Sequence, residues 1–346
     1  ELKTKPTQHS VKELQGMGIQ PDILVLRTER HLDDSMRMKV ASFCNVDLEC
    51  VVQSEDMPSI YEVPVSMQHQ GLDAAILRKI GIPVGETPAM KGWHDFLDKQ
   101  RNATREVHIG LIGKYDLQDA YKSIRESLNL AGIYNDVKAK LHFVNSEEIT
   151  KQNVAEKLSG LQGIVVCPGF GQRGIEGKII AAEYTRENDI PTFGICLGMQ
   201  MMVIEFARNI LGYKDANSSE MDDKTPHNVI DMMEEQKNIT QMGGTMRLGA
   251  YECELVKGSR AYEAYGEETL IKERHRHRYE FNNKYQEEFE KNGMKCVGIN
   301  PAANLVEIVE IPEKRWYIGT QFHPEYSSTV LNPHPLFMSF VKACAK

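Results

Sequence analysis

The segment Gly194-Ile-Cys-Leu-Gly198 places a cysteine between two glycines in the form G-x-nucleophile-x-G. An apolar run, residues 192–195, precedes the cysteine and a helical pattern follows it, as a tight strand-to-helix turn requires. The N-terminal dipole of that helix favours a thiolate at Cys196. The N–H of Leu197 can stabilise a tetrahedral oxyanion. We therefore predict that Cys196 is a nucleophile.

A thiol nucleophile needs a base, and Gln321-Phe-His-Pro-Glu325 supplies one directly after the apolar strand 316–322. His323 can pair with the thiol. Glu325, two residues further on, can orient the imidazole and stabilise its cation. A lone histidine is usually structural, but a His-Pro-Glu sequence at a strand end, combined with a cysteine turn, predicts a Cys-His-Glu triad.

Strands alternate with helices through the region that carries these residues. This alternation predicts an α/β fold with a doubly wound, mainly parallel sheet, whose ligands bind at the C-terminal strand ends. The predicted strands are 107–112, 139–144, 163–167 and 192–195, with further strands at 249–256, 295–299, 305–311 and 316–322. The predicted helices are 120–131, 152–158, 179–188 and 198–210.

The region before residue 83 has its own apolar pattern. We predict strands at 21–27 and 51–53, helices at 35–44 and 72–80, and an extended segment at 60–64. Residues 83–104 are polar and weakly periodic, which indicates a linker with a short helix at 93–97. The expected domains are therefore 1–82 and 105–346.

The composition excludes several classes of protein. The 346-residue chain carries a net charge of -8, which argues against general nucleic-acid binding. It has no apolar run long enough to span a membrane. The seven scattered cysteines indicate a reduced, cytoplasmic protein without a disulfide framework or a zinc motif. Because the sequence begins at Glu1, inside a dense polar motif, we expect upstream sequence to be missing.

The cysteine turn with Gly-Met-Gln at 198–200, together with Gln-Phe-His-Pro-Glu, resembles a class I (triad) glutamine amidotransferase domain. Further motifs narrow the resemblance to CTP synthases. They are Asp119-Ala-Tyr-Lys-Ser123, Asn217-Ser-Ser-Glu220, Gly243-Gly-Thr-Met-Arg-Leu-Gly249, Glu273-Arg-His-Arg-His-Arg-Tyr-Glu280 and, at the N-terminus, Glu1-Leu-Lys-Thr-Lys-Pro-Thr-Gln-His-Ser10. The resemblance implies that the first domain is the C-terminal remnant of a P-loop-type α/β synthetase domain.

The resemblance implies that Cys196 releases ammonia from glutamine and that the ammonia converts UTP to CTP at the expense of ATP. Oxyanion donors would be Gly169 and Leu197. Glutamine-binding residues would be Gly169, Leu197, Gly198, Met199, Gln200, Glu220 and Arg278. A free amino acid offers an ammonium group to Glu220 and a carboxylate to Arg278. Without the resemblance, Glu220 would be interpreted as a solvent-exposed acidic residue in a loop, and the Arg-His-Arg-His-Arg run as a charged surface.

The nucleotide sites are also implied by the resemblance. UTP, and CTP as feedback inhibitor, would contact Lys3, Thr4, Lys5, Pro6, Thr7, Gln8 and Lys39. Met57 lies in a segment that corresponds to an ATP contact. GTP is the family's allosteric activator, and Lys114, Tyr115, Lys122 and Arg173 lie in segments that resemble its coupling loops. Mg²⁺ serves the complete enzyme, which is a homotetramer in the family, and we assign no metal ligand in this chain.

Two departures from the family pattern affect these expectations. Pro168 occupies the first glycine position of the loop Cys167-Pro-Gly-Phe-Gly171 and has no N–H, so Gly169 must supply the loop's oxyanion donor. No G-x-x-x-x-G-K-[ST] phosphate loop occurs anywhere in the sequence, so we expect at most the glutaminase step. The alternatives are a different triad glutaminase, serving GMP or anthranilate synthesis, and a non-catalytic nucleotide-binding or assembly module.

Overall fold

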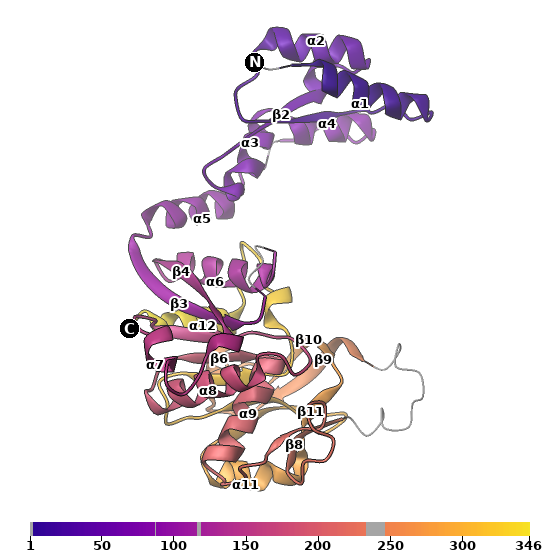
Figure 1. Cartoon of the computed structure of the whole chain (residues 1–346). Coiled ribbons are helices and arrows are strands. Elements are labelled where there is room, and N and C mark those ends of the chain that lie inside the picture. The colour runs from indigo at the N-terminus through magenta and orange to yellow at the C-terminus, as the bar shows by residue number, and fades with distance from the viewer. Residues whose placement is uncertain (1–2, 87, 116–118, 233–245) are drawn as a thin grey trace. The chain divides into compact units, whose positions relative to one another are not determined.

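The computed structural model describes residues 3–86, 88–115, 119–232 and 246–346 (Figure 1). Two compact units divide the chain, Glu1–Leu97 and Asp98–Lys346. The division lies inside the predicted linker, 83–104, where helix α5 (Lys91–Asn102) includes the predicted turn of helix. Residues 243–245 of the Gly-Gly-Thr-Met-Arg motif lie outside the described residues.

The first unit is built around two parallel strands, β1 (Leu24–Thr28) and β2 (Val51–Glu55). Helix α1 (Lys5–Gly16) and helix α2 (Asp34–Cys44) pack against them, and the small core contains Val11, Val40, Cys44 and Val51. Short 3-10 helices at Leu48–Cys50 and Ile60–Glu62 and helices α3 (Val63–His69) and α4 (Leu72–Lys79) complete this unit.

The prediction that residues 60–64 are extended was wrong. Ser59 accepts a hydrogen bond from the N–H of Tyr61, which caps the 3-10 helix. Pro64 then lies in the first turn of α3, where its missing N–H costs nothing because no helical acceptor precedes it. The proline that suggested extended chain therefore starts a helix.

The second unit contains a nine-stranded sheet in the order β10-β9-β12-β13-β14-β6-β5-β3-β4. The five strands from β14 to β4 are parallel, which confirms the predicted α/β fold with a parallel sheet. Four antiparallel strands extend this sheet. The strands are β3 (Arg105–Gly113), β4 (Val137–Asn145), β5 (Gly163–Val166), β6 (Thr192–Ile195), β9 (Arg247–Leu255), β10 (Leu270–His277), β12 (Lys295–Asn300), β13 (Leu305–Glu310) and β14 (Tyr317–Thr320).

Helices cover both faces of the parallel strands. Val107, Ile109 and Leu111 of β3 share a core with helices α6 (Lys122–Tyr134) and α12 (Pro335–Cys344). On the opposite face of the sheet, Ile112 of β3 packs with Ile164 and Val166 of β5. Helices α7 (Val154–Lys157) and α8 (Ile175–Glu187) cover these side chains. Helix α9 (Leu197–Asn209) is buried along its length beside α8.

The remaining elements lie beside α9 and at the antiparallel edge. A small sheet pairs β7 (Asn217–Ser218), β8 (Asn228–Met232) and β11 (Tyr279–Phe281). Helices α10 (Arg260–Ala264) and α11 (Gln286–Lys291) and short 3-10 helices at Ser146–Glu148, Asn283–Tyr285 and Pro324–Tyr326 fill the connections.

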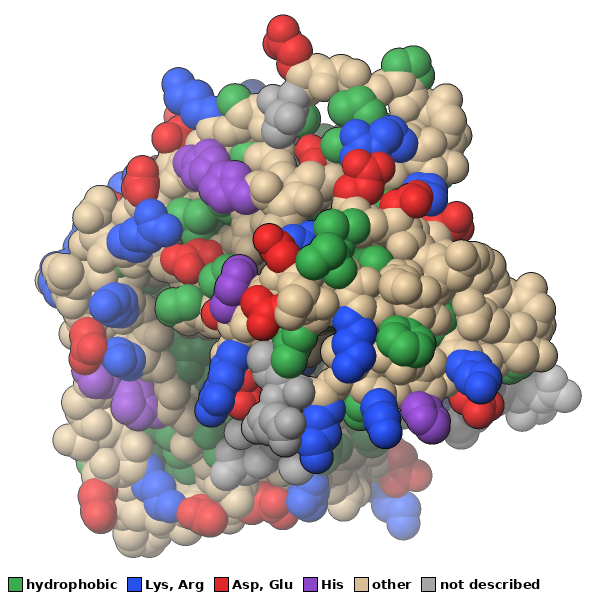
Figure 2. All heavy atoms as spheres, turned by 90° about the horizontal axis from the view of Figure 1, so that it is seen from above, with side chains coloured by type: hydrophobic (Ala, Val, Ile, Leu, Met, Phe, Trp, Pro, Cys, Tyr) green, Lys and Arg blue, Asp and Glu red, His purple; other side chains and the backbone are tan. Residues whose placement is uncertain are grey.

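Three further features bear on the class of protein. All seven cysteines are free and buried. Among the described residues, no helix combines the length and apolar character needed to cross a bilayer. Figure 2 shows both acidic and basic side chains on the viewed face.

Candidate active site

Cys196 lies at a sharp turn between β6 and α9. Its backbone angles are φ 52° and ψ -107°, a conformation that a residue with a side chain rarely adopts. The turn is held in place by a hydrogen bond of 2.7 Å from the N–H of Cys196 to the carbonyl of Thr320 in β14. The strain therefore persists because the neighbouring strand fixes the turn.

The two glycines of the turn are required by close backbone contacts. A Cβ atom on Gly198 would lie 1.9 Å from the carbonyl oxygen of Val166 in β5. One on Gly194 would lie 2.2 Å from the sulfur of Met202 and 2.8 Å from the backbone of Gly198. The spacing G-x-C-x-G is thus dictated by how tightly α9 packs against β5 and β6.

His323 and Glu325 follow β14 immediately, and both are buried. The Nδ1 of His323 lies 2.8 Å from Oε1 of Glu325, and the backbone N–H of His323 donates to the carbonyl of Arg274. Burial alone would lower the pKa of His323, but negative charge on the nearby Cys196 sulfur and on the Glu325 carboxylate raises it to about 11. The arrangement therefore favours an imidazolium whenever Cys196 carries negative charge.

Replacing Glu325 by Gln is expected to lower the pKa of His323, because a neutral amide stabilises the imidazolium less than a carboxylate does. Proton delivery to the leaving amine requires the imidazolium, so the alkaline limb of the kcat profile for glutamine hydrolysis should move to lower pH by about one unit or more. A pH-rate profile of both proteins checks this. An alkaline limb that does not move would show that Glu325 has no electrostatic role.

Two glutamine side chains connect the nucleophile to the wall of the site. The Nε2 of Gln321 lies 3.6 Å from the sulfur of Cys196. The Nε2 of Gln200 donates to Oε1 of Gln321 at 3.1 Å and to the carbonyl of Tyr279 at 2.9 Å. Sequence reasoning assigned Gln200 to glutamine binding and gave Gln321 no role, although Gln321 begins the His-Pro-Glu motif.

A cavity of about 520 Å³ opens beside Cys196. Seven of the predicted residues line it, namely Gly169, Cys196, Leu197, Gln200, Glu220, Arg278 and His323. Two predicted glutamine contacts do not, because Gly198 packs on Val166 and Met199 is buried against Gly319. Six lining residues were not predicted: Phe170, Met246, Arg276, His277, Tyr279 and Tyr326. Four of these belong to the two motifs around residues 243–249 and 273–280, which were the available signal.

The loop Cys167–Gly171 forms the wall opposite His323. A Cβ on Gly169 would lie 3.4 Å from a methyl carbon of Leu197, so the two predicted oxyanion donors are neighbours. The N–H of Gly171 donates to Glu220 at 3.1 Å, which ties the loop to the predicted ammonium ligand. Burial raises the pKa of Cys167 to about 12, so this thiol is protonated and unreactive beside Cys196.

The predicted coupling residues lie at the outer end of this loop. The ammonium of Lys114 contacts the carbonyl of Phe170 and lies 4.8 Å from its ring. The guanidinium of Arg173 and the ammonium of Lys114 each lie 5.3 Å from the ring of Tyr115. Lys122, by contrast, pairs with Glu126 on its own helix, so the structure brings together three of the four predicted residues.

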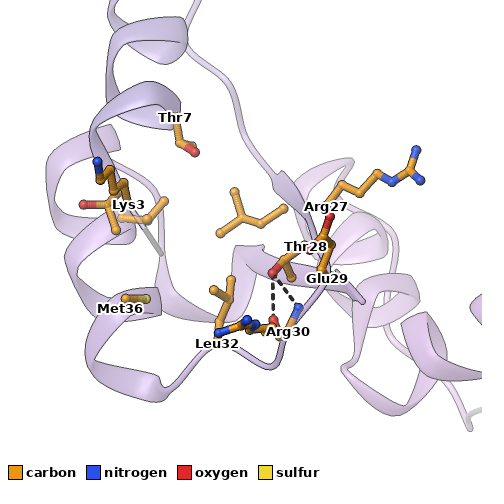
Figure 3. Close-up of a pocket in the computed structure, with 11 residues that line it drawn as sticks. Lys3, Thr7, Arg27, Thr28, Glu29, Arg30, Leu32 and Met36 are labelled. Carbon is orange, nitrogen blue, oxygen red and sulfur yellow. Dashed lines mark hydrogen bonds between the residues drawn. The ribbon is translucent and has the colours of Figure 1, made fainter. Parts of the chain in front are cut away.

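The first unit has a separate cavity of about 320 Å³ (Figure 3). Of the predicted nucleotide contacts, Lys3, Thr4 and Thr7 line it, whereas Lys5, Pro6, Gln8, Lys39 and Met57 do not. Gln8 instead donates to the hydroxyl of Thr4 at 3.2 Å. Arg27, near the end of β1, and Arg30, two residues after it, also line the cavity and were not predicted. Their position at the C-terminal end of a predicted strand was the available signal.

A strained cysteine turn, a buried His-Glu pair and a cavity at the C-terminal ends of parallel strands define a glutamine amidotransferase of the triad class. The class I glutamine amidotransferase family matches residues 116–343, and the CTP synthase N-terminus family matches residues 1–82. The chain belongs to the CTP synthase family.

Curated relatives agree with this assignment. The CTP synthase of Bacteroides thetaiotaomicron is 70% identical over 345 residues, which cover 99% of this chain and 64% of the relative. That of Porphyromonas gingivalis is 60% identical, with 100% and 64% covered. The chain therefore spans a little under two thirds of the length of these relatives.

A solved structure agrees as well. The glutaminase domain of Trypanosoma brucei CTPS, with bound acivicin, is 38% identical and superposes with a TM-score of 0.66. The match covers 69% of this chain and 94% of that one. It extends the family assignment from sequence to the fold around Cys196.

Proposed function

We propose that the second unit hydrolyses glutamine to glutamate and ammonia. The observation that carries this proposal is the strained Cys196 turn, which lines one cavity with the Glu325-paired His323 and with an acid and a base, Glu220 and Arg278. Glu220 binds the α-ammonium of glutamine, and Arg278 binds the α-carboxylate. These two contacts orient the side-chain amide toward the sulfur.

The chain's own groups account for each step. The thiolate of Cys196 attacks the amide carbon, and the N–H groups of Leu197 and Gly169 stabilise the oxyanion, each contributing roughly 10²–10³-fold in rate. The imidazolium of His323 donates its proton to the amide nitrogen, so ammonia leaves and a glutamyl thioester remains. Water, deprotonated by His323, then hydrolyses the thioester to glutamate and restores the thiol.

We further propose that the ammonia serves CTP synthesis, in which UTP is activated by ATP and aminated. Lys3, Thr4 and Thr7 would contact UTP or the inhibitor CTP, and Lys5, Pro6, Gln8 and Lys39 would join them only in a fuller assembly. Met57 would contact ATP. GTP would act near Lys114, Tyr115 and Arg173, and Lys122 is the least supported of that set. The sequence contains no phosphate loop, so we assign no residue of this chain to the ATP phosphates or to Mg²⁺. A cytoplasmic homotetramer is proposed for the complete enzyme.

The proposal is tested by incubating the chain with a glutamine-mimicking diazo-ketone and locating the adduct by peptide mass spectrometry. We expect labelling confined to Cys196 and blocked by glutamine, and no conversion of UTP to CTP when ATP and ammonia are added to this chain alone. Labelling spread over Cys167 and other thiols would favour the non-catalytic binding module. If this chain forms CTP, the proposal that it carries no residues for the ATP phosphates and Mg²⁺ is wrong.

A further inference from the structure

We propose that His277 is a positioning residue, which fixes the bend at Arg278 so that its guanidinium can receive the α-carboxylate of glutamine. This role rests on the proposed glutamine site, because Arg278 lines that site. It concerns a histidine of the Arg-His-Arg-His-Arg run that the triad chemistry does not use.

Strand β10 separates the charges of this run by its alternation. Arg274 and Arg276 are exposed, whereas Glu273, His275 and His277 are buried beneath them. Only the outer face of β10 is therefore a charged surface. On its buried face, His275 and His277 face Glu307 of β13, and Arg247 of β9 pairs with Glu307 at 2.5 Å. All four side chains in this buried cluster are at most 6% exposed.

Hydrogen bonds determine where the protons in the cluster lie. The carbonyl of Tyr279 can only accept, so the Nδ1 of His277, 3.1 Å away, carries a hydrogen. Burial keeps both rings neutral, since it lowers the pKa of His277 to about 3 and of His275 to about 2. The bare Nε2 of His277 therefore accepts from the Nδ1–H of His275 at 3.0 Å. His277 thus has a single tautomer and a single ring orientation.

The hydrogen bond from His277 to Tyr279 spans Arg278, the residue between β10 and β11. The same carbonyl accepts from Gln200 of α9 at 2.9 Å, so two donors from different elements fix it. Arg278 lines the glutamine cavity at this bend, whereas the carbonyl of Arg276, in β10 before the bend, lies 4.0 Å from the sulfur of Cys196. The bend therefore sets the position of the carboxylate ligand, while β10 itself lies beside the nucleophile.

The donor atoms of His275, His277 and Glu307 lie within 4.8 Å of one another, a spacing that could also hold a cation. Hydrogen bonds account for His277, whose two ring nitrogens both have partners, and Arg247 pairs with Glu307. The Nε2 of His275 and the Oε2 of Glu307 are buried and make no hydrogen bond to any described residue. We therefore assign His277 to positioning, and a chelator tests directly whether the cluster holds a cation.

The test measures how well glutamine protects Cys196 of the 346-residue chain from alkylation by iodoacetamide, which lacks a carboxylate contact to Arg278. His277→Leu removes the donor to Tyr279. We expect its protection constant for glutamine to be about 10-fold weaker, because a misaligned guanidinium loses a charge-assisted hydrogen bond, with alkylation in the absence of glutamine changed by about 2-fold or less. His277→Asn keeps a donor near the place of Nδ1 and should restore protection to within about 3-fold.

His334→Leu is the matched control, because His334 is a buried histidine of the same unit whose Nε2 pairs with Glu273 at 2.8 Å, outside the cavity. It should lower the Tm without weakening protection. If His334→Leu weakens protection as much as His277→Leu does, the loss reflects general stability and the inference is wrong. If His277→Leu fails to fold, His277→Phe takes its place, because it keeps a buried ring and still removes the donor to Tyr279; unchanged protection in that variant overturns the inference.

Two further outcomes are separable. Loss of protection when the wild-type chain is treated with EDTA would replace positioning by a metal site. Absence of glutamine protection in the untreated wild-type chain would refute the proposed function itself, before any variant is compared.

Discussion

Cys196→Ala is expected to lower the rate of glutamine hydrolysis by about 10⁴-fold or more, because no other group at the site can form the thioester. Glutamine binding should persist, since Glu220 and Arg278 are untouched. The change keeps the Cβ of a residue at positive φ, so the backbone strain of the folded state should be the same in both proteins. Glutamate release and glutamine binding by calorimetry measure the two effects separately.

Cys167→Ala is the control for this experiment. Cys167 lies three residues before Phe170 on the opposite wall, but its thiol is fully buried and held protonated. We expect its activity to stay within a few-fold of the wild type. Hydrolysis that survives in Cys196→Ala and disappears in Cys167→Ala would mean that the nucleophile has been misassigned.

Gly198→Ala is expected to destabilise the second unit by about 3 kcal/mol or more, a large fraction of the 5–15 kcal/mol typical of a folded domain. The added Cβ would meet the carbonyl oxygen of Val166 at 1.9 Å, and that oxygen belongs to a central strand that cannot shift alone. Urea or thermal unfolding measures the change.

Gly194→Ala should also destabilise the unit but by less, because its Cβ would meet backbone atoms at 2.8 Å rather than 1.9 Å, and its nearest contact, at 2.2 Å, is a methionine sulfur that can move. Gly16→Ala, at the end of α1, meets nothing within 4 Å and should be neutral. If Gly198→Ala unfolds no earlier than Gly16→Ala, the close approach of α9 to β5 does not exist in solution.

Cys196, His323 and Glu325 could be proposed as a triad because each lies in a short sequence motif. The motifs are visible in the sequence, although the contact that requires Gly198 is with Val166 of another strand. The parallel sheet was predictable for the same reason, since strand-helix alternation is a local pattern. Cys196 and His323 could be combined because parallel strands end at one edge of the sheet.

The remainder depends on long-range packing, which a single sequence does not display. Met199 was assigned to glutamine binding because it directly follows the cysteine turn. Its side chain lies in the core instead, because α9 is buried along its length. From the sequence, the histidines of β10 were interpreted as surface residues. In the structure they are buried, because residues of β9 and β13 pack against them. Residues 60–64 were misread because a proline is compatible with both an extended chain and the first turn of a helix. Lys5 and Lys39 lie outside the cavity of the first unit, because the sequence does not show which side chains of α1 and α2 face that cavity.

The bond between the N–H of Cys196 and the carbonyl of Thr320 has a consequence for biosynthesis. Thr320 and His323 lie 124 and 127 residues after Cys196 (320 − 196 and 323 − 196), close to the C-terminal helix. A ribosome therefore synthesises most of the second unit before Thr320 can accept the hydrogen bond that holds the turn and before His323 can act as the base for the Cys196 sulfur. Until then the cysteine is an ordinary thiol, without the activation that would expose a nascent chain to oxidation or unwanted acylation.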